Sequence, residues 1–175
     1  MTRSRIARAA ALAAVLAAAP LPAMAEFLSP DWSSFSISGI EQPDWVAGER
    51  EGNYIGMCLT CGETLMFQVQ TLPDDGTGGR VKSGETTAET YTGIGKANAE
   101  RLGSGAAYYG TEDISFASAV GFKTSAMTAT GDYASTYQLW DDGQQLIVKA
   151  YGKDQKRVEK LAKDAFTAAA PMTFK

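Results

Sequence analysis

The clearest signal along the chain is an alternation of apolar and polar residues between positions 64 and 72. In an extended chain, alternate residues lie on opposite faces. One face here carries Leu65, Phe67 and Val69, and the other carries Met66, Gln68 and Gln70. A period of two predicts a half-buried antiparallel strand. Residues 53–58 are expected to form a neighbouring strand, and residues 35–40 an earlier one.

The second half of the chain predicts more strands and then a helix. Residues 106–140 are rich in aromatic and β-branched side chains, which favour strands. Asp141–Gly143 predicts a tight hairpin turn, with a last strand returning over 144–151. After a cap at Asp154, apolar residues recur at helical spacing, and they are Val158, Leu161, Ala162, Ala165 and Phe166. We expect this stripe to lie against the sheet.

The segments between these elements are rich in glycine and polar residues. Residues 73–85 predict a flexible loop, and residues 41–52 a turn or irregular segment in which Trp45 and Val46 are packed. Thr86 and Glu89 have the spacing of a capping box, which predicts a helix running to about residue 102. The sequence therefore predicts an α+β fold: an antiparallel sheet covered by a C-terminal amphipathic helix and an inserted helix.

The C-terminal third resembles the Mog1/PsbP-like family. The resemblance lies in the hairpin "YASTYQLWDDGQQLIVKAYG" followed by the closing helix "DQKRVEKLAKDAF", and elsewhere in the order of elements. It implies a Mog1/PsbP-like sandwich and an accessory or partner-binding role, since members of that family are mostly not enzymes. The cysteines of this chain, Cys58 and Cys61, are not part of the family's pattern.

The N-terminus has the features of a secretory signal. Arg3, Arg5 and Arg8 precede an apolar stretch too short for a bilayer span, and small residues stand at Ala23 and Ala25. We expect residues 1–25 to be a cleavable signal peptide and residues 26–175 to form a single α+β domain in the periplasm or outside the cell. No later apolar run is long enough to span a membrane.

Composition excludes several functional classes. The 175 residues include no histidine, which excludes Ser-His-Asp and Cys-His catalysis as well as histidine-ligated metals and haem. Lysine and arginine number 16 against 20 acidic residues, and they form no basic run or stripe except on the outer face of the predicted closing helix, which we interpret as a solvated face. Nucleic acid is therefore not an expected partner. No cofactor is expected.

The two cysteines, Cys58 and Cys61, are the candidate site. Four interpretations are open: a thioredoxin-like redox pair, half of a zinc site completed by a second copy, a Cu(I) site with Met57 or Met66, and a structural disulfide. We favour the disulfide, because the compartment is oxidising and no other thiols are available.

The aromatic residues supply a second candidate. We interpret them as packed in the core or on sheet faces, with a small-molecule groove as the alternative; they are Trp32, Trp45, Tyr108, Tyr109, Tyr133, Tyr137 and Trp140. The sequence thus predicts an exported, non-enzymatic accessory or binding protein, with a periplasmic thiol-redox or Cu(I)-handling protein as the alternative. Its partner is expected to be another periplasmic protein or a small ligand, and its oligomeric state stays open.

Overall fold

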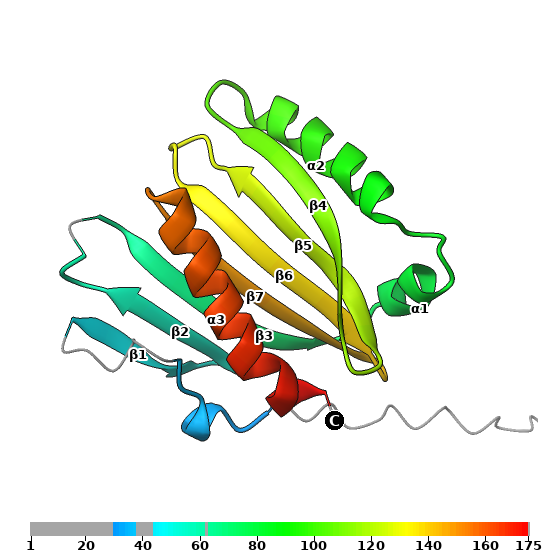
Figure 1. The fold of residues 1–175 in the computed structure, drawn as a ribbon, viewed down its shortest axis with the longest axis horizontal. Helices are drawn as coiled ribbons and strands as arrows, with labels where there is room; N and C mark the ends of the chain where they lie inside the picture. The colour runs from blue at the N-terminus through cyan, green and yellow to red at the C-terminus, as the bar shows by residue number, and fades with distance from the viewer. Residues whose placement is uncertain (1–29, 38–43, 62, 175) are drawn as a thin grey trace, which may run out of the picture.

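The protein folds around an antiparallel β-sheet, and the computed structural model describes residues 30–37, 44–61 and 63–174. Within these residues the strands are β1 (Trp45–Arg50), β2 (Asn53–Cys58), β3 (Leu65–Pro73), β4 (Ala107–Phe116), β5 (Ala119–Met127), β6 (Tyr133–Asp141) and β7 (Gln144–Gly152). The helices are η1 (Trp32–Ser34), α1 (Thr77–Lys82), α2 (Ala88–Leu102) and α3 (Gln155–Thr173). The predicted α+β class is confirmed (Figure 1). The expected signal segment, residues 1–25, lies outside the described residues.

The sheet consists of two antiparallel halves joined by one long-range ladder. Its strand order is β1-β2-β3-β7-β6-β5-β4, and all neighbours are antiparallel. Strands that are neighbours in sequence pair within each half, whereas β3 pairs with the last strand, β7, in the middle of the sheet. The predicted hairpin between β6 and β7 is confirmed, with Asp142 and Gly143 at positive φ in a two-residue turn.

Helix α3 covers one face of the sheet, across β3, β7 and β6 (Figure 1). Of its predicted apolar stripe, Val158, Leu161, Ala162 and Ala165 are buried. Phe166 is only partly buried, and its ring lies 4.7 Å from that of Tyr137. Asp154 caps the helix as predicted, because its carboxylate accepts a hydrogen bond from the Arg157 backbone N–H. Facing this stripe are the alternating residues of the central strands, which are Leu65, Phe67, Val69, Leu139, Leu146 and Val148. This layer is the main hydrophobic core.

Helices α1 and α2 pack at the β4–β6 end of the sheet, on the face opposite α3. There the ring of Tyr91 from α2 lies 4.7 Å from that of Phe122 and 6.3 Å from that of Trp140. The predicted inserted helix is therefore confirmed. The helix begins one residue later than predicted, because its cap is Thr87 rather than Thr86. The Thr87 hydroxyl accepts a hydrogen bond from the Thr90 backbone N–H.

The segment predicted as a flexible loop, residues 73–85, contains the short helix α1, so that prediction is wrong in part. The carboxylate of Asp74 accepts hydrogen bonds from the backbone of Gly76 and Gly78, which fixes the start of the turn. Lys82, at its end, forms an ion pair with the buried Asp141 at the end of β6. The hydrogen bond from Lys82 and a second one from a serine hydroxyl hold the pKa of Asp141 below its ordinary value. Long-range contacts thus order a segment whose local composition favours a loop.

The N-terminal strands differ from the sequence prediction. Residues 35–37 are not in a strand, and the remainder of the predicted strand 35–40 lies outside the described residues. The segment expected to be irregular forms β1, which pairs with β2 through a two-residue turn with Glu51 and Gly52 at positive φ. Of the two residues expected to be packed, Trp45 contacts the core, but Val46 is 60% exposed.

None of the helices in the described part of the chain combines the length and the apolar character needed to cross a membrane.

Candidate functional site

The two cysteines form a disulfide at the corner between β2 and β3. Cys58 is the last residue of β2 and is buried, whereas Cys61 lies half-buried in the connecting loop, with 5.7 Å between their Cα atoms. The favoured disulfide is thus present. The chain continues from Cys61 into strand β3, whereas thioredoxin-like sites place the first cysteine at a helix N-terminus that lowers its pKa.

The structure does not bring the candidate methionines to the two sulfurs. Met57 pairs across the ladder with Met66, and Cys58 pairs with Leu65. Successive residues of a strand point to opposite faces, so the two methionines lie together on the face away from α3. The side chain of Cys58 lies on the α3 face, within the core. Among the described residues, no group of three or more His, Cys, Asp or Glu side chains is arranged to hold a metal ion.

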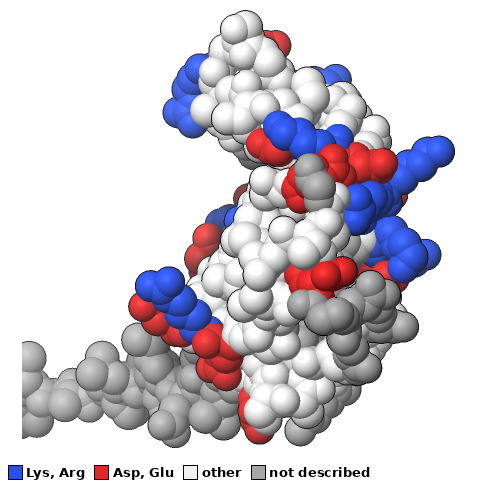
Figure 2. Space-filling view, turned by 90° about the vertical axis from the view of Figure 1, so that its left-hand side faces the viewer, with Lys and Arg blue, Asp and Glu red and all other residues white. Residues whose placement is uncertain are grey.

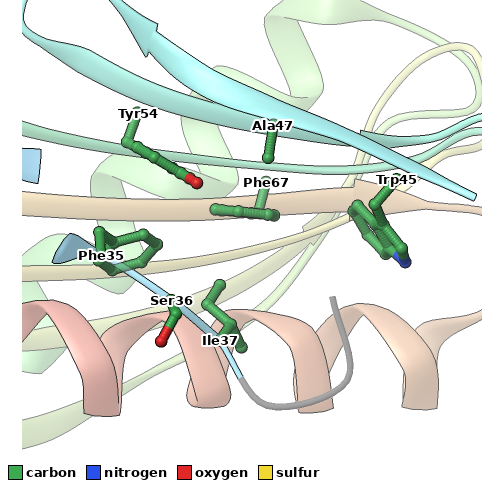
Figure 3. A pocket seen from close by; sticks show the side chains of 7 residues that line it. All are labelled: Phe35, Ser36, Ile37, Trp45, Ala47, Tyr54 and Phe67. Atoms are coloured by element: carbon green, nitrogen blue, oxygen red, sulfur yellow. The ribbon is translucent and has the colours of Figure 1, made fainter. Parts of the chain in front are cut away.

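A cavity lined mainly by aromatic and aliphatic side chains lies near the N-terminal end of the sheet. Its volume is about 280 Å³, it is partly open to the surface, and its lining comes from residues 35–37 and from strands β1, β2 and β3. Figure 3 shows its lining, which consists of Phe35, Ser36, Ile37, Trp45, Ala47, Tyr54 and Phe67. We call it the aromatic pocket. None of its lining residues is charged.

The pocket is built by the pairing register of three strands. Ala47 of β1 lies opposite Gly56 of β2, and Gly56 lies opposite Phe67 of β3. The side-chain positions of this row share the α3 face, because directly paired residues of an antiparallel ladder do so. A Cβ at Gly56 would lie 2.1 Å from the Phe67 ring, so that ring occupies the space over the glycine. The small size of Ala47 and Gly56 therefore leaves the pocket open, and the ring of Phe67 forms its floor.

Ring contacts fix the walls of the pocket. The ring of Phe35 lies 4.7 Å from that of Tyr54, and the ring of Trp45 lies 6.0 Å from that of Phe67. Behind this wall Trp32 packs edge-on against Phe35 at 5.6 Å, and its indole N–H donates to the backbone carbonyl of the β1–β2 turn. Residues 32–35 are therefore anchored to the sheet, and the pocket is formed without a ligand.

Sequence reasoning identified this site in part. Of the aromatic residues considered for a groove, Trp45 lines the pocket and Trp32 supports its wall. The pocket's other aromatic residues, Phe35, Tyr54 and Phe67, were not among them. The remaining candidates lie elsewhere in the fold, for example Trp140, which is buried on the other face beside Phe122. No local signal marks the missed residues, because their proximity depends on strand pairing.

Replacing both cysteines by alanine is expected to lower the free energy of unfolding by about 2 kcal/mol or less. A closed loop of about four residues restricts the unfolded chain less than the ~15-residue loop for which about 3 kcal/mol is typical. Urea denaturation of the double variant measures the loss, and reduction of the wild-type protein before denaturation is the control. A loss above about 4 kcal/mol would contradict a purely local role for Cys58 and Cys61.

Comparisons with known proteins extend to the fold alone. The chain matches no protein-family model and no curated protein. Among solved structures, it is similar to cyanobacterial PsbP (CyanoP) from Synechocystis sp. PCC 6803, with 16% sequence identity, a TM-score of 0.43, and coverage of 73% of this chain and 80% of that one. It is also similar to LpqN, described as involved in cell envelope biogenesis of Mycobacterium tuberculosis, with 10% identity, a TM-score of 0.36 and 77% of each chain covered. Cyanobacterial PsbP bears one of the two names of the family that the C-terminal third of the sequence resembles.

Proposed function

We propose that the protein is an exported, non-enzymatic accessory protein that recognises an apolar group of its partner in the aromatic pocket. The observation that carries this proposal is the pocket itself, which is open, preformed and free of charged residues. Trp45 and Tyr54 are partly exposed there, beside the buried rings of Phe35 and Phe67. Binding sites for organic groups are typically concave, mostly apolar and already formed in the free protein. The hydroxyls of Ser36 and Tyr54 supply the polar side-chain groups that orient a bound molecule.

The size of the pocket indicates a modest affinity for an isolated small ligand. Apolar burial contributes only about 25 cal/mol per Å², and a pocket of about 280 Å³ buries a small group. This contribution is too small to overcome the entropic cost of tight association by itself. The pocket therefore suits an apolar side chain that belongs to a larger interface.

Export is supported by the N-terminal sequence and by the disulfide. Signal-like features precede residue 26, and a disulfide between Cys58 and Cys61 persists in an oxidising compartment. N-terminal sequencing of the protein from a periplasmic fraction should give Glu26 as the first residue. Cytoplasmic protein that retains Met1 would contradict this part of the proposal.

The neutral fluorescent dye N-phenyl-1-naphthylamine is expected to bind the pocket, with increased dye emission and quenching of Trp45. Ala47→Phe should abolish this binding, because position 47 points toward the pocket and a phenyl ring would fill it. The matched control is Val46→Phe, since the neighbouring side chain lies on the other face of β1. Equal dye binding by the two variants, or none by the wild-type protein, would contradict the proposed site.

A further inference from the structure

The aromatic pocket opens beside the edge of the sheet. Strand β1 is the first strand in the sheet order, and among the described residues no strand pairs with it on the side away from β2. Trp45 and Ala47, at alternate positions of β1, line the pocket. The same strand therefore carries one wall of the pocket and an outer backbone edge.

The hydrogen-bond phase of the β1–β2 ladder shows which backbone groups point outward. The N–H of Leu59 donates to the carbonyl of Asp44 at 2.7 Å, and the register places these two residues opposite each other. In an antiparallel ladder, hydrogen-bonded and non-hydrogen-bonded pairs alternate. Val46 and Gly48 therefore direct their backbone groups toward β2. Trp45 and Ala47 direct theirs to the outer edge.

Along β1, the side chains alternate between the two faces of the sheet and the backbone groups alternate between β2 and the outer edge. At the pocket these two alternations coincide. Trp45 and Ala47 have outward backbone groups and pocket-facing side chains. An extended chain that paired with them would place a residue directly opposite Ala47, with its side chain on the same face of the sheet and about 5 Å away between Cβ atoms. That side chain would stand at the mouth of the pocket. An added strand would thus gain backbone hydrogen bonds and one apolar anchor together.

The chemistry of the edge defines the occupant. Natural proteins often protect an exposed edge strand with charged residues or proline. The first four residues of β1, "WVAG", include neither. Figure 2, in which the left-hand side of Figure 1 faces the viewer, shows a mostly uncharged central surface with Lys, Arg, Asp and Glu side chains mainly around it. An extended segment with uncharged, alternately apolar residues fits this surface.

A second copy of this chain fits the edge less well. Self-pairing of β1 would place Trp45, Ala47 or Glu49 opposite the pocket-facing position. Trp45 already packs against Phe67 in its own pocket, alanine is too small to fill the space, and glutamate is charged. None of these residues therefore supplies an apolar side chain that is both free and large enough to act as the anchor.

We propose that an extended segment of a partner protein docks as an added strand on β1, with an apolar side chain opposite Ala47 inserted into the aromatic pocket. This proposal rests on the proposed binding role of the pocket and specifies its partner: a neutral peptide segment with apolar residues at every second position. The segment would extend the sheet beyond β1, and the pocket would select its anchor residue.

The test uses the full-length protein and a capped seven-residue peptide of alternating threonine and leucine. Amide hydrogen exchange followed by NMR should slow about tenfold or more at Trp45 and Ala47 when the peptide is added. Exchange at Val46 and Gly48 should stay unchanged, because these amides are already bonded to β2. Peptide binding that does not slow exchange at Trp45 and Ala47 selectively over Val46 and Gly48 would overturn the proposal.

A proline substitution distinguishes binding through the backbone edge of β1 from binding through the pocket alone. Ala47→Pro removes an outward N–H without removing a bond to β2, so it should abolish peptide protection at Trp45. Ala47→Ser, which keeps the N–H, should retain it. If the dye still binds the wild-type pocket but the peptide protects neither amide, the strand proposal fails while the proposed function stands. Dimerisation without peptide, with the same two amides protected, would replace the partner by a second copy and overturn the proposal as well.

Discussion

Replacing Phe67 by alanine is expected to lower the free energy of unfolding by about 3–5 kcal/mol, the range for deletion of a fully buried phenyl ring. Phe67 is fully buried, and its ring contacts those of Phe35, Trp45 and Tyr54. It therefore supports β3, the pocket floor and residues 35–37 together. Urea denaturation monitored by circular dichroism measures the loss, and dye binding to the variant at low urea should also fall.

Leu59→Ala is the control for this prediction. Leu59 lies close in sequence but is 64% exposed in the loop between the cysteines, so its truncation should change stability by no more than about 0.5 kcal/mol. Similar losses for the two substitutions would show that the ring of Phe67 does not hold the N-terminal half of the sheet together.

Gly121→Ala is expected to cost about 3 kcal/mol, at the upper end of the usual range for overpacking. Gly121 lies in β5 opposite Leu139 of β6, and a Cβ there would stand 1.9 Å from the backbone carbonyl oxygen of Gln138. Because the obstacle is main chain rather than a flexible side chain, the clash is relieved only by displacing the β5–β6 ladder. Thermal and urea unfolding should both show the loss.

A second glycine-to-alanine substitution provides the matched comparison. Gly48 also lies in a strand, but a Cβ at that position meets no atom within 4 Å. Gly48→Ala should therefore stay within about 0.5 kcal/mol of the wild-type protein. A neutral Gly121→Ala would mean that β5 and β6 separate without cost at this point, which contradicts the tight packing of their backbones.

The elements predicted correctly are those with a regular local pattern. Alternation over β3 identified its buried face, helical spacing identified the buried stripe of α3, and Asp142 with Gly143 formed the predicted hairpin turn. In each case neighbouring residues carry the signal themselves, because a strand and a helix impose periods of 2 and 3.6 on any chain that buries one face. The cysteine spacing and the oxidising compartment expected from the N-terminal sequence likewise pointed to the disulfide.

The elements that were missed depend on distant residues. Residues 77–82 have a glycine-rich sequence that favours a loop, and α1 is held at its end by the ion pair between Lys82 and Asp141. Strand β1 has an exposed, partly charged sequence without alternation, and its pairing with β2 supplies the order that its own residues do not. Burial and pairing overrode weak local preferences at both places.

The sequence by itself determined the class of fold, the faces of its most regular elements and the chemistry available to a site that has no histidine and two cysteines. The tertiary structure alone decided where the aromatic pocket, the proposed binding site, lies. Ala47, Gly56 and Phe67 are separated along the chain, and only the register of β1, β2 and β3 sets them in one row beside Trp45. Side-chain period is a local property, whereas register is fixed by turns and by the burial of a shared face, so a pocket spanning three strands exists only once they have paired.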